Sequence, residues 1–320
     1  MKIKKNKTCW ICDSFVHAKL VRTRDGNKYP LNICCKCNFY FFPKDFTWLI
    51  TSDRFEQNRL KKAGLEIPNI KEDFRNGAIQ TKRYIKEWIT KADYSKNILE
   101  IGCSWGYFLK PIKDLGINCV GVEINPIRAN YVEKKLKIPC CQTLEEVEQR
   151  KTMFHKIFIF FTLQYISHPK EYINRLLDLL KRGGTIYIVT PNHEDVLKDI
   201  WRNQGFIDFF YEKMSVGYYT VKSLHRLMVH INDNFRFYNI RTKQGYSFLN
   251  HLSWYFTDRP RTTGIVGGDN YCEVISEQIK NSGHMLGKKI AKLIYDFCKQ
   301  YYRLIEQYNY GNQIILKIIK

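Results

Sequence analysis

The 320-residue sequence has no hydrophobic run that approaches the ~18 residues of a membrane-spanning helix. It also has no secretory signal, because Cys9-x-x-Cys12 stands where such a signal needs its apolar stretch. Internal repeats, low-complexity tracts and blocks of about five or six like charges are missing as well. These features predict a cytoplasmic globular protein without an integral membrane segment, a repeat architecture or a charged tail.

Acidic residues are scarce in this chain. Asp and Glu number 31 against 52 Lys and Arg, which leaves a formal charge of +21. Such a charge favours anionic partners: nucleic acid, nucleotide sugars, phosphorylated glycans or a membrane surface. Lys, Asn and Ile are abundant together, however, so genome composition accounts for part of the excess. Charge alone therefore does not assign nucleic-acid binding.

Cysteine, in contrast, is plentiful, with eleven residues. In a cytoplasmic protein this favours metal ligands and buried thiols over disulfides. Cys9 and Cys12 form one C-x-x-C pair, and Cys34 and Cys37 form a second. Two such pairs on tight turns complete a tetrahedral zinc site, and the residues between them have the pattern of a hairpin. We expect a zinc ribbon over residues 1–45. Its zinc would be structural, because four sulfur ligands leave no open position for catalysis.

Residues 96–126 have the pattern of a nucleotide-binding βαβ unit. A short apolar strand precedes Gly102 and Gly106, and a second strand ends at Glu123. The glycines let a ligand approach the backbone, and the acid can accept hydrogen bonds from ribose hydroxyls. The dinucleotide pattern G-x-G-x-x-G is missing, because Ser104 and Tyr107 occupy two of its three glycine positions.

The pattern E-x-G-x-x-x-G that begins at Glu100 resembles the first motif of class I S-adenosylmethionine-dependent methyltransferases, with Ser104 replacing the middle glycine. The methyl donor has no pyrophosphate, so a looser glycine spacing is compatible with it. The resemblance implies a set of cofactor-binding residues along three strand ends. These residues are Glu100, Gly102, Cys103, Ser104, Gly106, Glu123, Ile124, Gln142, Thr143 and Leu144.

The order of the later segments narrows the resemblance. An apolar strand at 157–161, a helix at 170–180, the turn Lys181-Arg182-Gly183-Gly184 and a strand ending in Thr190-Pro191-Asn192 follow one another. With a ribbon in front, this succession resembles the ribbon-plus-methyltransferase proteins of bacterial sugar and surface-polysaccharide modification, including sugar C-methyltransferases. It implies a Rossmann-like α/β fold with a seven-stranded, mostly parallel sheet whose last strand is antiparallel.

Four regions are expected along the chain: the ribbon at 1–45, a connector at 46–78, the cofactor-binding core at 79–245 and a C-terminal part at 246–320. Within the core, a helix over 105–115 should be kinked or ended early by Pro111. The C-terminal part contains a glycine-rich loop that could cover the active site, then a long amphipathic helix and the closing strand. This helix either packs on the sheet or serves dimerisation or contact with a membrane surface.

The catalytic residues of the family cannot be transferred to this chain. Many relatives carry a Glu-His pair where Gln164-Tyr165 stands, and a later family histidine is missing before Tyr218. Methyl transfer depends chiefly on positioning, and it requires a base only if the acceptor must lose a proton. The candidates are His193, Tyr165 and Tyr218. His193 is the best placed, because it follows a core strand.

The expected function is S-adenosylmethionine-dependent O- or C-methylation of a sugar, a nucleotide sugar or a related small anionic metabolite. Two alternatives stay open at this point. A ribbon and a basic surface also suit a ribosomal or transfer RNA methyltransferase. A third possibility is a protein that binds S-adenosylmethionine without turnover. The sequence specifies neither the methylated atom nor the oligomeric state.

Overall fold

The computed structural model describes residues 8–43, 70–231, 234–259, 279 and 284–320. Most of the expected connector, residues 46–69, lies outside this part of the chain. The glycine-rich loop around residues 264–268 does so too. The expectations for both segments stay predictions.

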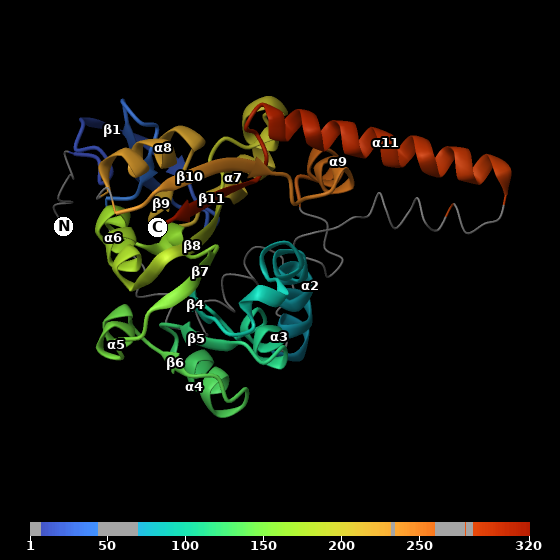
Figure 1. Ribbon diagram of the computed structural model, residues 1–320. Helices are drawn as coiled ribbons and strands as arrows, with labels where there is room; N and C mark the ends of the chain where they lie inside the picture. The colour runs from blue at the N-terminus through green and yellow to red at the C-terminus, as the bar shows by residue number, and fades with distance from the viewer. Residues whose placement is uncertain (1–7, 44–69, 232–233, 260–278, 280–283) are drawn as a thin grey trace.

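Seven strands form the main sheet, in the order β10-β11-β8-β7-β4-β5-β6 (Figure 1). The strands are β4 (Asn97–Ile101), β5 (Asn118–Val122), β6 (Cys140–Cys141), β7 (Phe154–Phe160), β8 (Leu180–Pro191), β10 (Phe237–Lys243) and β11 (Gln313–Ile319). Strand β11 runs antiparallel to both of its neighbours, whereas β8, β7, β4, β5 and β6 pair in parallel. This confirms the predicted Rossmann-like methyltransferase fold.

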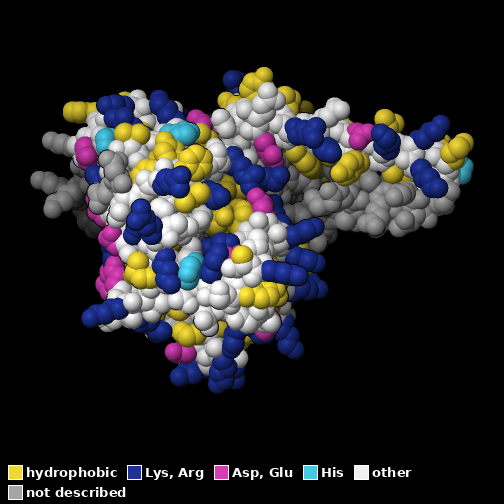
Figure 2. All heavy atoms as spheres, in the orientation of Figure 1, with side chains coloured by type: hydrophobic (Ala, Val, Ile, Leu, Met, Phe, Trp, Pro, Cys, Tyr) yellow, Lys and Arg dark blue, Asp and Glu magenta, His cyan; other side chains and the backbone are white. Residues whose placement is uncertain are grey.

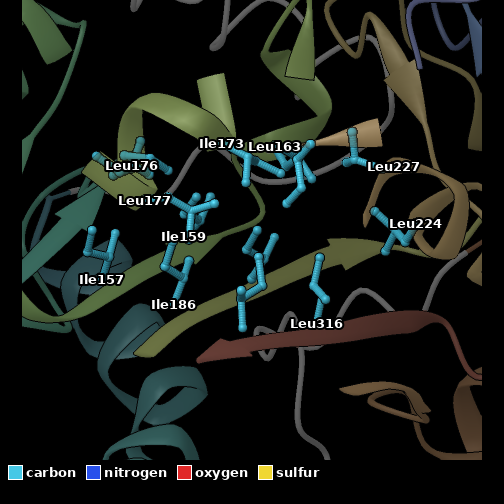
Figure 3. Close-up of a cluster of buried hydrophobic side chains, with 14 of the residues drawn as sticks. Ile157, Ile159, Leu163, Ile173, Leu176, Leu177, Ile186, Leu224, Leu227 and Leu316 are labelled. Atoms are coloured by element: carbon cyan, nitrogen blue, oxygen red, sulfur yellow. The ribbon is translucent and has the colours of Figure 1, made fainter. Parts of the chain in front are cut away.

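Helices cover both faces of the sheet. The helices of the described chain, not all of which lie on the sheet, are α2 (Ile70–Trp88), α3 (Leu109–Asp114), α4 (Pro126–Lys134), α5 (Leu144–Gln149), α6 (Pro169–Leu179), α7 (Gln204–Phe210), α8 (Val221–His230), α9 (Phe248–Thr257) and α11 (Met285–Gln307). Successive β7 side chains point to opposite faces. Phe158 packs with Trp88 of α2, while Ile157 and Ile159 belong to the cluster with Ile173 of α6 (Figure 3). Burying each such side chain contributes about 1.5–3 kcal/mol.

The first helix after β4 begins later than expected. Residues 105–108 form turns, and α3 starts only at Leu109, because Gly102, Ser104 and Gly106 all have positive φ angles. Pro111 therefore lies in the first turn of α3, where its missing N–H has no intrahelical acceptor. The predicted kink or early stop is wrong for this reason, since α3 continues to Asp114 with Leu115 as its C-cap. The late start leaves the loop after β4 free to line a cavity.

The residues of the turn predicted at Lys181–Gly184 belong to strand β8, where its pairing with β7 is interrupted. Leu180 already pairs with Phe154, but the next paired residue of β8 is Thr185, opposite Lys156. Gly183 has a φ of +75°. The N–H of Gly183 donates to the carbonyl oxygen of Lys320 (2.9 Å), and the N–H of Lys320 donates to that of Gly184 (3.1 Å). This irregular part of β8 thus holds the C-terminal residue.

The N-terminal cysteine segment forms a second sheet, in the order β1-β2-β3-β9. The predicted hairpin consists of β1 (Val16–Arg22) and β2 (Lys28–Cys34), followed by β3 (Tyr40–Phe41). The fourth strand, β9 (Gly217–Tyr218), comes from the segment between α7 and α8. The N-terminal segment is therefore joined to the core by backbone hydrogen bonds. The proposed domain boundary near residue 45 separates segments that share one sheet.

Helix α11 extends away from the main sheet (Figure 1). Its C-terminal part packs on the body, where Ile305 shares a buried cluster with Phe206 and Trp254. The expected amphipathic helix is thus present, but packing on the sheet applies to one end of it. Within the described residues, no helix is both long and apolar enough to span a membrane.

Nine cysteines of the described chain are free thiols, and most of them are buried, as predicted. Cys298 of α11 differs, because it is disulfide-bonded. The expectation that thiols prevail over disulfides is therefore wrong at this one residue.

Candidate active site

The loop after β4 forms a tight cradle. Gly102 has a φ of +73°, and a Cβ atom there would lie 2.2 Å from Thr162 Oγ1. Glu100, the penultimate residue of β4, is 1% exposed. Among the described residues its Oε2 has no hydrogen-bond partner. Burial raises the pKa of Glu100 well above its usual value, and the nearby charge of Glu123 raises this pKa further. A donor group of a bound ligand would satisfy this oxygen.

Glu123 connects the loops that follow β4 and β5. The N–H of Ser104 donates to Glu123 Oε2, and the N–H of Asn125 donates to Oε1, both at 2.8 Å. Asn125 in turn caps α4 by accepting from the N–H groups of Ile127 and Arg128. The Glu123 carboxylate is therefore fixed before any ligand binds. A carboxylate oxygen can accept more than one hydrogen bond, so binding the loops is compatible with accepting from a ligand hydroxyl.

A cavity of about 480 Å³, here called the first cavity, opens above these loops. Most of the residues predicted to bind the cofactor line it: Glu100, Gly102, Ser104, Glu123, Ile124, Gln142, Thr143 and Leu144. Cys103 and Gly106 are not among its lining residues. Cys103 is buried with its Sγ 3.8 Å from Cys140 Sγ, and a Cβ on Gly106 would lie 2.8 Å from Leu136 Cδ1. Cys103 and Gly106 thus support the loop on the side away from the cavity.

The opposite wall of the first cavity was not predicted. It comes from α2, through Gln80, Thr81 and Tyr84. Tyr84 packs in the core, where its ring stacks on Trp88 and Phe160, with ring centroids 4.7 and 5.0 Å apart. The same ring also faces the cavity. Helical periodicity cannot distinguish core packing from lining a cavity, because the Tyr84 side chain does both.

A second cavity of about 250 Å³ adjoins the first, and the two share Gln80, Tyr84 and Phe161 as lining residues. Its wall is rich in aromatic rings and carries charged side chains of both signs. The aromatic residues are Tyr84, Phe161, Phe206, Phe209, Phe210, Tyr218 and Tyr246. The charged residues are Arg24, Arg83, Asp195 and Glu212. A compact polar molecule next to the first cavity would fit this environment.

Glu212 connects the two cavities. Its Oε2 forms an ion pair with Arg24 (3.0 Å), and its Oε1 accepts hydrogen bonds from Tyr165 (3.2 Å) and Ser215 (3.1 Å). Tyr165 lines the first cavity, whereas Arg24 and Glu212 line the second. Arg24 and Glu212 were not predicted. They lie 188 positions apart, and no local motif relates them.

Two further groups of the second cavity have constrained environments. Burial raises the pKa of Asp195 to about 7. Its Oδ1 accepts from the N–H of Leu197 (2.7 Å) at the start of a π-helical turn, Val196–Ile200. The hydroxyl of Tyr218 accepts from the N–H of Glu212 and donates to its carbonyl oxygen, both at 2.8 Å. Tyr218, a predicted catalytic candidate, thus holds the backbone of Glu212.

His193 lies apart from both cavities. It is 4% exposed, its Nε2 is 2.9 Å from the Tyr211 hydroxyl, and its ring stacks on Tyr40 of β3. Among the described residues, it lines neither cavity. Burial lowers the pKa of His193 well below its usual value. Of the three catalytic candidates, the structure therefore brings Tyr165 and Tyr218 together around Glu212 and leaves His193 in the interior.

The four predicted metal ligands cluster as expected. The sulfur atoms of Cys9, Cys12, Cys34 and Cys37 all lie within 4.8 Å of one another, and all four residues are buried. The N–H of Ile11 points to Cys9 Sγ, and the N–H of Cys37 points to Cys34 Sγ, both at 3.4 Å. Such N–H groups stabilise thiolates, so this donor set fits a tetrahedral zinc ion.

Comparisons with known proteins agree with this geometry. A family model described as a methyltransferase domain matches residues 74–233. The mitochondrial ubiquinone biosynthesis O-methyltransferase of Mus musculus is 25% identical over 107 residues, which cover 30% of this chain and 28% of that protein. The ubiquinone biosynthesis O-methyltransferase of Pelagibacter ubique is 30% identical over 125 residues, which cover 34% of this chain and 52% of that protein.

The chain therefore spans between about a quarter and a half of the length of these two relatives. Among solved structures, an S-adenosylmethionine-dependent methyltransferase from Archaeoglobus fulgidus is similar, with 16% identity and a TM-score of 0.48. That alignment covers 78% of this chain and 97% of the other.

Proposed function

This chain belongs to the methyltransferase domain family, and on this premise we propose that it methylates a hydroxyl group of a small anionic acceptor of sugar type. The fold and the methyltransferase family support S-adenosylmethionine-dependent methyl transfer as the activity. The acceptor is the proposed part. One observation carries it: a second cavity with arginines and aromatic rings shares a wall with the first cavity.

We propose that the first cavity holds S-adenosylmethionine. Glu123 would accept hydrogen bonds from ribose hydroxyls, Gln142 and Thr143 would contact the adenine, and Glu100 would accept from a donor group of the ligand. The bound cofactor supplies an electrophilic methyl group on a sulfonium. The protein supplies orientation and a dry site, which can account for much of the acceleration.

The chemistry of the second cavity supports the choice of acceptor. Arginine is the preferred partner of carboxylate and phosphate groups, and Arg24 and Arg83 both line this cavity. The flat rings of Phe206, Phe209 and Phe210 can cover the apolar face of a sugar. O-methylation is favoured over C-methylation because the two relatives described above are named O-methyltransferases. Their names also favour a second acceptor, an intermediate of ubiquinone biosynthesis.

RNA is a less suitable acceptor. A cavity of about 250 Å³ suits a small molecule better than a polynucleotide. Figure 2 shows Lys and Arg spread over the visible face rather than gathered in one stripe. A stripe would be the usual electrostatic footprint of a nucleic-acid site.

We also propose that Cys9, Cys12, Cys34 and Cys37 bind one structural zinc ion. The ribbon would then be a stable wall beside the second cavity. Its hairpin turn carries Arg24, which reaches this cavity.

Incubation with S-adenosylmethionine labelled on the methyl group tests the proposal. The acceptor panel should contain nucleotide sugars, intermediates of ubiquinone biosynthesis and total cellular RNA. Label in a nucleotide sugar supports the proposal, and label in a ubiquinone intermediate supports the second candidate. Label in RNA refutes both. A protein that binds S-adenosylmethionine in calorimetry but labels nothing on the panel would be a non-catalytic binding protein.

A further inference from the structure

We propose that Tyr165 and Glu212 form the proton relay of the reaction, with Glu212 as the final proton acceptor and Arg24 of the hairpin turn as its positioning residue. This inference rests on the proposed O-methylation, because a hydroxyl acceptor must lose its proton. It assigns catalysis to a carboxylate that belongs to no sequence motif of the chain.

The first argument is the position of the hydrogen bond between the two side chains. Tyr165 lines the first cavity, Glu212 lines the second, and 3.2 Å separates the Tyr165 hydroxyl from Glu212 Oε1. The bond therefore passes from one cavity to the other. A reacting hydroxyl must lie where the cavities meet, because it has to reach the methyl group from the acceptor side. Tyr165 and Glu212 are placed to receive its proton there.

The second argument is the support of the carboxylate. Glu212 is held on every side by groups that donate to it or fix its backbone. Its Oε2 pairs with Arg24, its Oε1 accepts from Ser215, and its backbone N–H and carbonyl oxygen both bind the Tyr218 hydroxyl. The side chains of Arg24 and Glu212 are only 17% and 13% exposed, so solvent screens their attraction less than at the surface. Such a carboxylate keeps one orientation, and the adjacent guanidinium favours its ionised form over the neutral acid.

The third argument concerns Arg24, which is itself held in place. Its backbone N–H donates to the carbonyl oxygen of Tyr211 (2.8 Å), and its Nε donates to that of Phe209 (2.8 Å). Its guanidinium also lies 3.7 Å from the centroid of the Phe209 ring. Through these interactions of Arg24, the hairpin turn contacts the segment before Glu212. An arginine held in this way orients a carboxylate better than a mobile lysine.

The step balances without another reactant. The acceptor O–H breaks as its proton passes to the Tyr165 oxygen, while the Tyr165 proton passes to Glu212 Oε1. The electron pair left on the acceptor oxygen forms the new bond to the methyl carbon. The methyl–sulfur bond breaks, and its electron pair stays on sulfur. A carboxylate and a sulfonium become a neutral acid and a neutral thioether.

The other acids and bases near the cavities are less suitable. Asp195 uses Oδ1 to cap Leu197, and it is not among the described residues that line the first cavity. His193 is buried beneath Tyr40 and lines neither cavity within the described chain. Glu100 and Glu123 line the first cavity, where the cofactor is proposed to bind. Glu123 accepts a hydrogen bond from the backbone N–H of Ser104, and Glu100 faces the proposed cofactor.

The test compares Glu212→Gln, Tyr165→Phe, Arg24→Met and Arg24→Lys with the wild type, using the panel member that the wild type methylates fastest. Glu212→Gln should lower kcat roughly 10²–10⁴-fold, and the fall of kcat at acid pH should disappear with the carboxylate. Tyr165→Phe should lower kcat at least about tenfold. Arg24→Lys should recover part of the activity that Arg24→Met loses. S-adenosylmethionine affinity, measured by calorimetry, should stay within about threefold for all four, which also shows that they fold.

A matched control comes from the same contact between hairpin and α7. Arg22 and Asp208 form a more exposed ion pair (3.7 Å), and neither residue lines a cavity within the described chain. Asp208→Asn should therefore leave kcat and its pH profile unchanged. Loss of activity in this control equal to that in Glu212→Gln would overturn the relay, because it would assign the effect to docking of the hairpin.

A second measurement needs no acceptor. The carbon-13 resonance of the Glu212 carboxyl, assigned by its loss in Glu212→Gln, reports the ionisation of this group. Arg24→Met should raise its titration midpoint by about one unit or more, and Tyr165→Phe should raise it by less, because each removes a group that favours the carboxylate. Unchanged midpoints in both variants, or full kcat in Glu212→Gln, would overturn the relay. A wild-type protein that methylates nothing on the panel refutes the proposed function instead.

Discussion

The ring of Tyr40, from the N-terminal sheet, lies flat against the imidazole of His193, with 3.6 Å between the ring centroids and 16° between the planes. His193 follows β8 of the main sheet, and its N–H donates to the carbonyl oxygen of Tyr219 (2.7 Å). One buried residue therefore connects the ribbon, β8 and the segment after β9, through its ring and its backbone N–H. This position supports a role in stability, although the sequence predicts a catalytic one.

Replacing His193 with Ala should lower the free energy of unfolding by about 2–4 kcal/mol, because it removes a buried ring and leaves a void under Tyr40. Chemical denaturation at pH 7.5 measures this change. Affinity for S-adenosylmethionine should persist in the folded fraction. A variant with full stability and a kcat reduced to background would show that His193 acts as the base after all.

The pH dependence of stability gives a second test of His193. Since burial holds the pKa of folded His193 well below the unfolded value of about 6.5, its neutral form stabilises the fold above that pH. This stabilisation should be lost as the pH falls below about 6.5. In His193→Phe, which cannot ionise, the unfolding free energy should fall less between pH 7 and pH 5 than in the wild type. Parallel pH profiles for the two proteins would contradict the burial of a neutral imidazole.

Replacing Glu123 with Ala should weaken S-adenosylmethionine binding by roughly 10–100-fold, since charged hydrogen bonds contribute about 1.5–3 kcal/mol each. The substitution also releases the N–H groups of Ser104 and Asn125, so the cradle should become looser. Calorimetry measures the affinity, and Glu133→Ala on the exposed side of α4 serves as the control. Equal affinities for wild type and Glu123→Ala would refute the cofactor site.

The cysteine cluster should contain one zinc ion per chain. Replacing Cys9 with Ser should remove this ion and destabilise the ribbon, because a segment this small depends on its metal for folding free energy. Atomic absorption measures the metal content. Cys35→Ser is the matched control, because Cys35 is exposed and outside the cluster. A folded wild-type protein without zinc would contradict the site.

Replacing Asp195 with Asn should stabilise the protein at neutral and basic pH. The pKa of Asp195 is raised from 3.8 to about 7, so the folded state favours the protonated form, and ionisation costs stability as the pH rises from about 4 to 7. Asn keeps the capping oxygen and does not ionise. The gain in unfolding free energy should be roughly 2–4 kcal/mol at pH 8 and near zero at pH 4. Asp178→Asn, on an exposed position of α6, should show no such pH dependence.

The cofactor loops could be predicted from the sequence because their determinants are local. Gly102 and Glu123 follow adjacent strands, and the ends of adjacent parallel strands meet at one edge of the sheet. The seven-stranded sheet with its antiparallel last strand was predicted from the family resemblance. The start of α3 was less predictable, because positive φ angles at Ser104 and Gly106 are decided by the surroundings of the loop.

The acceptor side could not be predicted because its residues meet only in the folded chain. Arg24 comes from a hairpin turn, and Glu212 lies in an irregular segment before β9. Each looks like an ordinary surface charge in the sequence. His193 shows the opposite case, since its place after a strand is correct but the ribbon covers it. The rule that ligands bind beyond the carboxyl ends of strands locates a residue along the sheet. It does not tell whether another segment of the chain covers that residue.

The pairing of β3 with β9 affects how this protein folds during its synthesis. Tyr40 pairs with Tyr218, so the edge of β3 has no partner strand until residue 218 has left the ribosome. Most of the main sheet is translated in that interval. The ribbon is therefore among the first segments to be made and among the last to be completed. A nascent chain that stalls before residue 218 would expose the unpaired edge of β3, an open template for aggregation.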